Sequence, residues 1–151
     1  MSHNPQELND LLVSLFYDVE RMEERALTGG QFSDLSLREM HVIDQVCRAQ
    51  TERPARMSEL ARRLSITKGS LTVAVKTLEK KGYLSRVQDG GDRRITFVRP
   101  TPRGEAADAL HTLYHQKLVG AVTDALDQQQ LEVLVRALAA VRAYFSENGV
   151  A

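Results

Sequence analysis

Apolar residues recur at helical spacing along this 151-residue chain, in blocks separated by turn and capping residues. The first block runs from Leu8 to Leu27, spans about five turns and ends at Gly29 and Gly30. The second opens with a capping box formed by Ser36 and Glu39, and Pro54 breaks it. Two amphipathic helices are therefore expected before residue 55.

Two short helices joined by a tight turn are predicted next. Ser58 is expected to cap a helix over Glu59–Leu64, and Ser65-Ile66 leaves room only for a turn. Thr67 is expected to start a second helix that runs to Lys81 and stops at Gly82. Such a pair has the helix-turn-helix arrangement.

A hairpin and two longer helices complete the pattern. Strands are expected at 83–87 and 95–98, around the turn residues 89–92. Thr101-Pro102 starts one long helix, and Asp127 with Gln130 starts the last. The expected fold is mainly α with a small β-hairpin wing: a winged helix-turn-helix region at 36–101, with helical dimerisation segments at 1–35 and 102–151.

Composition narrows the class of protein. The single cysteine, Cys47, cannot form an internal disulfide, and no stretch of 18 apolar residues or signal-like N-terminus is present, so a cytoplasmic protein is expected. Catalytic signatures such as Gly-x-Ser-x-Gly, a phosphate-binding loop or a dinucleotide fingerprint are absent, so an enzyme is not expected. No cofactor is implied.

Charge is unevenly distributed, although the net charge is zero. Residues 53–103 contain thirteen Lys and Arg but four Asp and Glu, a balance of +9, and the rest of the chain carries −9. A basic block of this kind favours binding to a polyanion.

The helix expected at 67–81 has two distinct faces. Leu71, Val75 and Leu78 share one side and should pack on the domain. A glycine in the first turn of a helix costs roughly 0.5–1 kcal/mol, yet it permits close approach to another surface. The outer face and the hydroxyls that flank it suit contact with bases and phosphates. The alternative is a face that is only solvated. The residues concerned are Thr67, Gly69, Ser70, Thr72, Val73, Lys76 and Lys80.

The hairpin tip carries two adjacent arginines, Arg93 and Arg94. An exposed arginine suits the minor groove of DNA, where negative potential is concentrated. Asp92 is expected to orient Arg94 through a bidentate ion pair, with Arg86 as the competing partner. The alternative is an ordinary solvated turn.

These motifs resemble the MarR family of bacterial regulators. The resemblance lies in LEKKGYLSR at 78–86, DRRITFVRPTPRG at 92–104 and the helix layout of nearly the whole chain. It implies a winged helix-turn-helix repressor that binds double-stranded DNA as a homodimer. The DNA contacts it implies are Thr67, Lys68, Ser70, Thr72, Val73 and Lys76 in the major groove, with Arg94 held by Asp92 in the minor groove.

A narrower resemblance links QFSDLSLREMH at 31–41 and LHTLYH at 110–115 to the branch that represses bacterial fatty-acid synthesis genes. That branch implies an acyl chain on acyl carrier protein as co-regulator. The candidate ligand-binding residues are then His41, His111, Tyr114 and His115. A regulator that senses another small apolar ligand, a metal or an oxidant is the alternative.

The histidines and the cysteine each allow two interpretations. His111 and His115 stand at i, i+4 and could share a metal, with His41 as a third ligand through tertiary proximity. Packing, hydrogen bonding or a ligand pocket is the other interpretation. Cys47 lies on an apolar face, which favours a small buried hydrophobe over a redox sensor.

The end helices carry apolar stripes too long for one small domain to cover. A twofold partner would cover them, and a homodimer would read a pseudopalindrome with half-sites about one helical turn apart. A monomeric helical bundle is the alternative. A winged-helix module that binds an acidic protein instead of DNA also fits the fold.

Overall fold

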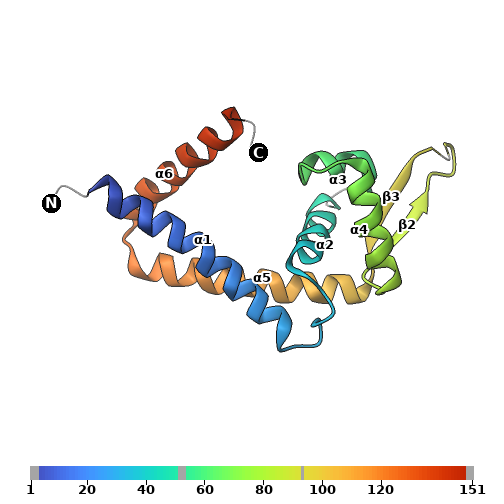
Figure 1. Cartoon of the computed structure of the whole chain (residues 1–151), viewed down its shortest axis with the longest axis horizontal. Helices are drawn as coiled ribbons and strands as arrows, with labels where there is room; N and C mark the ends of the chain where they lie inside the picture. Colours follow the sequence, from blue (N-terminus) through green and yellow to red (C-terminus); the bar gives the residue numbers. More distant parts are fainter. Residues whose placement is uncertain (1–3, 51–53, 93, 149–151) are drawn as a thin grey trace. The chain divides into compact units, whose positions relative to one another are not determined.

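A computed structural model describes residues 4–50, 54–92 and 94–148 (Figure 1). The described chain is mainly helical with one small antiparallel sheet, as expected. Its elements are α1 (Pro5–Thr28), α2 (Leu37–Ala49), β1 (Ala55–Arg56), α3 (Met57–Arg63), α4 (Lys68–Lys80), β2 (Leu84–Gln88), β3 (Thr96–Pro100), α5 (Pro102–Ala125) and α6 (Gln128–Glu147).

Contacts divide the chain into two compact units, residues 1–111 and 112–151, with the boundary inside α5. The first unit holds α1 to α4, the sheet and the start of α5. The second holds the rest of α5 and α6. Within the described residues, no helix is both long enough and apolar enough to cross a membrane.

Helix ends follow the capping signals closely. The Ser36 hydroxyl accepts a hydrogen bond from the Glu39 amide at 3.2 Å, and the Ser36 amide donates to the Glu39 carboxylate at 2.9 Å. Asp127 and Gln130 form the same reciprocal pair at the start of α6. At α1 the helix begins earlier than expected, because the Asn4 side chain caps it and proline occupies its first turn.

The predicted cap at Ser58 is wrong. Ser58 lies inside α3, and Arg56 occupies the N-cap position without a side-chain hydrogen bond. The reason is a third strand that the apolar pattern did not predict. Strand β1 contains two residues, pairs antiparallel with β3 through Ala55 and Val98, and leads directly into α3. A strand of two residues is too short to show the alternation of apolar and polar residues by which strands are recognised in a sequence.

The sheet has the strand order β1-β3-β2. Strands β2 and β3 form the expected hairpin, in register from Leu84 opposite Pro100 to Gln88 opposite Thr96. Each strand is shifted by one or two residues from its predicted bounds, but the turn between them is where the Asp and Gly residues indicated. The hairpin extends beyond α4 as a wing (Figure 1).

The core of the first unit lies between α2, α3, α4 and the sheet. The predicted inner face of α4 is confirmed, because Leu71, Val75 and Leu78 are fully buried. Cys47 packs against this core, and burial raises the pKa of its thiol to about 12. The thiol therefore stays protonated at neutral pH, which favours the buried-hydrophobe interpretation over a redox sensor.

Helix α5 starts in direct contact with the base of the wing. The Thr101 amide donates to the Tyr83 carbonyl at 3.0 Å, and the Thr101 hydroxyl donates to the Gly82 carbonyl at 2.6 Å. The same hydroxyl accepts from the Gly104 amide at 3.2 Å. A Cβ atom at Gly104 would lie 2.2 Å from the Tyr83 carbonyl oxygen, so only glycine allows this approach.

Candidate nucleic-acid interface

The turn between α3 and α4 sets the direction of α4. Ser65 adopts a positive φ of 52°, and the Ile66 amide donates to the Ala61 carbonyl at 3.0 Å. Thr67 then caps α4 by accepting from the Ser70 amide at 3.1 Å, while its hydroxyl donates to the Ser70 hydroxyl at 2.9 Å. These two hydroxyls hold the N-terminus of α4 in place and stay at the surface.

The outer face of α4 is exposed, as the helical spacing predicted. Val73 is 66 % exposed. Thr72 is half-buried, and its hydroxyl donates to the Lys68 carbonyl at 2.8 Å. The other predicted contact residues of this face are exposed: Thr67, Lys68, Gly69, Ser70 and Lys76.

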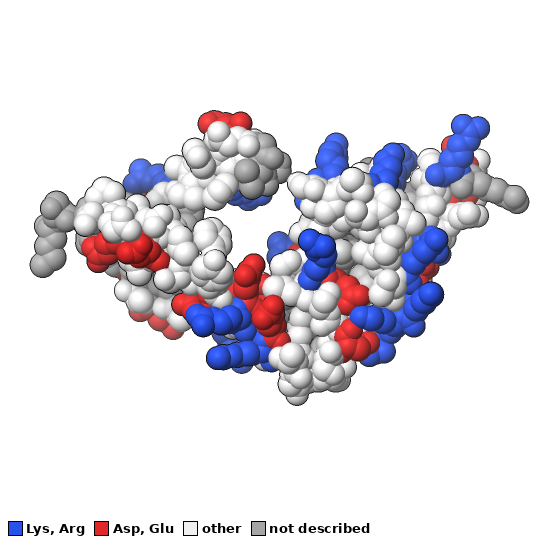
Figure 2. Space-filling view, in the orientation of Figure 1, with Lys and Arg blue, Asp and Glu red and all other residues white. Residues whose placement is uncertain are grey.

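A groove separates the N-terminal turns of α4 from the wing. Its charged lining consists of four cationic side chains, and its described lining contains no carboxylate. Figure 2 shows Lys and Arg side chains gathered over α3, α4 and the wing. A concave surface of one charge focuses the field and attracts a polyanion. The four cations are Arg56, Lys68, Arg86 and Arg94.

Part of the basic block is neutralised within the fold. Ion pairs join Arg63 to Glu59 at 3.3 Å, Lys81 to Glu39 at 2.8 Å, Arg86 to Glu79 at 2.7 Å and Arg103 to Asp34 at 3.3 Å. Among the described residues, the basic side chains of the block that form no ion pair are Arg56, Arg62, Lys68, Lys76, Lys80, Arg94 and Arg99. These seven are the ones best able to meet phosphates.

The wing tip differs in detail from the expected arrangement. The Asp92 carboxylate accepts from the backbone amide of Arg94 at 2.9 Å, so it shapes the turn and does not grip the Arg94 guanidinium. The competing partner, Arg86, pairs with Glu79 from α4. Arg94 is consequently an exposed cation at the mouth of the groove. Arg93 lies outside the described residues.

Tyr83 fixes the base of the wing to the start of α2. Its hydroxyl donates to the Asp34 carboxylate at 2.6 Å, and the Arg103 guanidinium lies 4.4 Å from its ring centre. The hydrogen bond from Tyr83, assisted by the charge of Arg103, lowers the pKa of Asp34. Burial, with the Asp34 hydrogen bond, raises the pKa of Tyr83 to about 12. The sequence did not indicate this cluster, because its members meet only through tertiary contacts.

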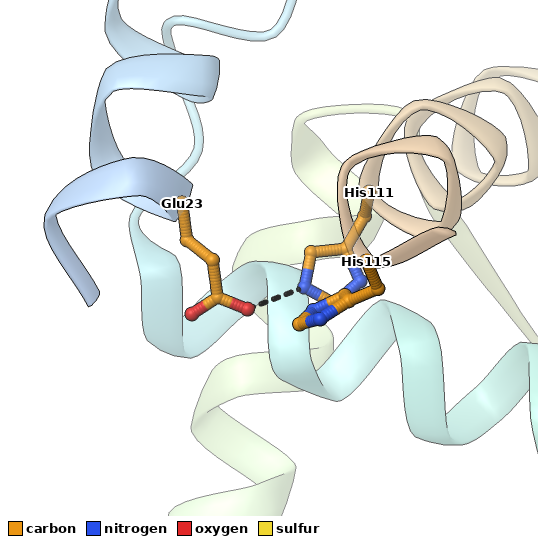
Figure 3. Close-up of side chains that lie close together, drawn as sticks. All are labelled: Glu23, His111 and His115. Atoms are coloured by element: carbon orange, nitrogen blue, oxygen red, sulfur yellow. Dashed lines mark hydrogen bonds and ion pairs between the residues drawn. The ribbon is translucent and has the colours of Figure 1, made fainter. Parts of the chain in front are cut away.

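The candidate ligand residues fall into both units. His41 and His111 belong to the first unit and meet at Glu23, a buried carboxylate of α1. His115 follows His111 by one turn of α5 (Figure 3), and Tyr114 lies beside Lys117, whose Nζ is 5.7 Å from its ring centre.

Glu23 was missed from the sequence, although a signal was present. It stands four residues from both Val19 and Leu27, so it places a carboxylate inside an apolar helical stripe.

A fold with these elements, an exposed second helix and a charged wing is a winged helix-turn-helix protein. Residues 33–95 match the model of the MarR family. In this segment and in its winged helix-turn-helix fold the chain is similar to the MarR family of regulators. Its matched relatives are named as transcriptional regulators and not as enzymes.

Individual relatives agree with this assignment. The chain is 31 % identical over 88 residues to YhjH of Bacillus subtilis, an uncharacterised regulator, covering 58 % of this chain and 49 % of YhjH. The chain thus spans about half the length of that relative. Over 139 residues it is 27 % identical to the regulator AdcR of Streptococcus pneumoniae, covering 88 % of this chain and 93 % of AdcR.

A solved structure extends the similarity to nearly the whole fold. Streptococcus pneumoniae FabT, crystallised in complex with DNA, is 29 % identical to this chain with a TM-score of 0.86. The match covers 95 % of this chain and 99 % of FabT. Many further solved structures match as well, and those below 25 % identity, such as Staphylococcus aureus MepR bound to ethidium bromide, share the fold.

Proposed function

We propose that this protein is a sequence-specific DNA-binding transcriptional repressor that acts as a homodimer. The observation that carries the proposal is the groove between α4 and the wing, with four cations and no carboxylate in its described lining. Helix α4 would enter the major groove through its exposed face, and Arg94 would reach the minor groove. The similarity to FabT, which was crystallised with DNA, supports the same role.

Exposed apolar residues of the end helices support the homodimer. Leu8, Leu11, Leu15 and Phe16 of α1 are each more than half exposed, and no described residue of α6 is buried. Apolar surface of this extent is typical of a protein-protein interface. A twofold dimer would present two α4 helices to half-sites about 34–36 Å apart on one side of the duplex.

Selection from a randomised duplex pool, followed by fluorescence anisotropy on the enriched sequence, tests the proposal. An enriched pseudopalindrome is expected. Arg94→Ala should weaken binding by about 1–3 kcal/mol, roughly five- to 150-fold, without changing the dimer mass in sedimentation. Arg21→Ala is the matched control, because it removes the same charge from a side chain that is 65 % exposed on α1.

Two results would contradict the proposal. A pool without an enriched sequence would favour the winged-helix protein-interaction module, whose partner would be an acidic protein. Equal DNA affinities of Arg94→Ala and the native chain would refute the assignment of Arg94 to the minor groove. The role of α4 would then be tested separately with variants of Lys68 and Lys76.

A finer proposal concerns the regulated genes. The resemblance to the fatty-acid branch at 31–41 and 110–115, together with the 29 % identity to FabT, favours control of fatty-acid synthesis genes with an acyl carrier protein as partner. Adding acylated carrier protein to the anisotropy assay should shift DNA affinity, whereas the unacylated carrier should not. Equal curves with both would reject this assignment.

A further inference from the structure

Two threonine hydroxyls in the middle of α4 are already bonded within the helix. The Thr72 hydroxyl donates to the Lys68 carbonyl at 2.8 Å. The Thr77 hydroxyl donates to the Val73 carbonyl at 3.1 Å. Neither proton can reach an acceptor on a base edge unless its bond within the helix breaks first. Recognition of bases in the middle of α4 therefore depends on something other than hydrogen bonds donated by these threonines.

Val73 projects from the second turn of α4 and is exposed. At about 100° per residue, Gly69 lies within about 40° of Val73 on the same face, one turn earlier. The nearest atom to a Cβ built at Gly69 is the Thr67 hydroxyl oxygen, at 3.8 Å. Because glycine adds no side chain beside Val73, another surface can closely approach the methyl groups of the valine.

Two lysines flank Val73 along the helix. Lys68 lies in the first turn of α4 and lines the groove between α4 and the wing. Lys76 follows Val73 by three residues, and both lysines are exposed. Contacts with phosphates position a protein on the duplex but carry no sequence information directly. The lysines would therefore hold α4 against the backbone, while Val73 between them meets the base edges.

The chemistry of the major groove decides which base suits a valine. Its base edges carry hydrogen-bond donors and acceptors, and one apolar group, the 5-methyl group of thymine. A valine placed against a donor or acceptor removes water from it without supplying a partner, which costs free energy. Against the thymine methyl group, both apolar surfaces leave water, which is favourable. A valine at this point of the face therefore favours thymine.

We propose that Val73 selects thymine in the operator, through contact between its methyl groups and the 5-methyl group of the base. This inference rests on the proposed function, because it requires α4 to lie in the major groove. It adds which base is recognised and by which residue. Recognition at this position would depend on an apolar contact and not on a hydrogen bond.

Replacement of thymine by uracil tests the contact, since the two bases differ only in the 5-methyl group. Each thymine of the duplex selected from the randomised pool is replaced in turn, and DNA affinity is measured by fluorescence anisotropy at one salt concentration. For at least one thymine in each half-site, the native chain should lose about fourfold in affinity. That factor corresponds to the burial of one methyl-sized group.

Variants assign the effect to Val73. Val73→Ala should bind the thymine duplex more weakly than the native chain does, and should bind the thymine and uracil duplexes equally at that position. Val87→Ala is the matched control, because it removes the same two methyl groups from a valine that is 43 % exposed on β2. This control should keep the fourfold effect of uracil. Alanine has a higher helix propensity than valine, so Val73→Ala should fold normally, which thermal melting checks.

The outcomes separate this inference from the proposed function. Unchanged affinity at every uracil position, or the same loss in Val73→Ala as in the native chain, would overturn the role of Val73. Selected half-sites without thymine would overturn it too. In these cases the protein still binds a selected duplex, so the proposed function stands. A pool that yields no enriched sequence would instead reject the proposed function, and the role of Val73 with it.

Discussion

Gly104→Ala should separate the wing from α5. The new Cβ would lie 2.2 Å from the Tyr83 carbonyl oxygen and 3.2 Å from the Tyr83 carbonyl carbon. Both atoms belong to the backbone, so the clash cannot be relieved by rotating a side chain. Restoring ordinary contact requires a shift of roughly 1 Å, which would stretch the 3.0 Å hydrogen bond from Thr101 to Tyr83 beyond bonding distance.

The expected cost follows from these terms. Overpacking costs about 1–3 kcal/mol, and the lost hydrogen bond adds about 1 kcal/mol. The higher helix propensity of alanine offsets about 0.5–1 kcal/mol of this loss. The net loss should be about 1–3.5 kcal/mol in the free energy of unfolding.

Urea denaturation at one fixed protein concentration measures this loss, since a dimer makes apparent stability depend on concentration. Gly120→Ala is the control on the same helix. A Cβ there meets nothing within 4 Å, so that variant should gain about 0.5–1 kcal/mol. Unchanged stability of Gly104→Ala would refute the close contact between α5 and the base of the wing.

Two further predictions concern α4 and the base of the wing. Gly69→Ala adds a Cβ whose nearest neighbour is the Thr67 hydroxyl at 3.8 Å. The free energy of unfolding should therefore rise by about 0.5–1 kcal/mol, while DNA affinity falls at least fivefold. Higher stability with unchanged DNA affinity would show that glycine is not needed at this position for close approach to DNA. The folded-state pKa of Asp34 lies below its ordinary value of 3.8, so its stabilisation is complete above that pH and is lost as the pH falls through the folded value. Asp34→Asn should therefore reduce the loss of stability below pH 4 in acid unfolding curves, and identical acid profiles would contradict the Tyr83–Asp34 interaction.

Local signals predicted most of the fold. The caps at Ser36, Thr67 and Asp127, and the buried face of α4, depend on residues within a few positions of one another, and the structure confirms them. Strand β1 was missed because it exists only through its pairing with β3.

The same distinction between local signals and tertiary contacts applies to the candidate site. The exposed face of α4 follows from helical periodicity, so the sequence could indicate which side chains point outward. The pairing of Arg86 with Glu79 and the meeting of Glu23 with His41 and His111 depend on how elements pack, and no local pattern records them. Glu23 alone carried a detectable anomaly, as a carboxylate in an apolar stripe.

The ion pair between Arg86 and Glu79 has a consequence for the ionic-strength dependence of DNA binding. A cationic side chain releases a counterion from DNA when it neutralises a phosphate. Arg86 is already paired with the Glu79 carboxylate, and it can neutralise a phosphate only if that ion pair breaks. Arg86 should therefore contribute little to the release of salt ions. Each phosphate neutralised lowers the slope of log K against log salt concentration by about 0.9. The slope per subunit should therefore reflect the unpaired cations of the block and fall well short of the thirteen that the sequence contains there.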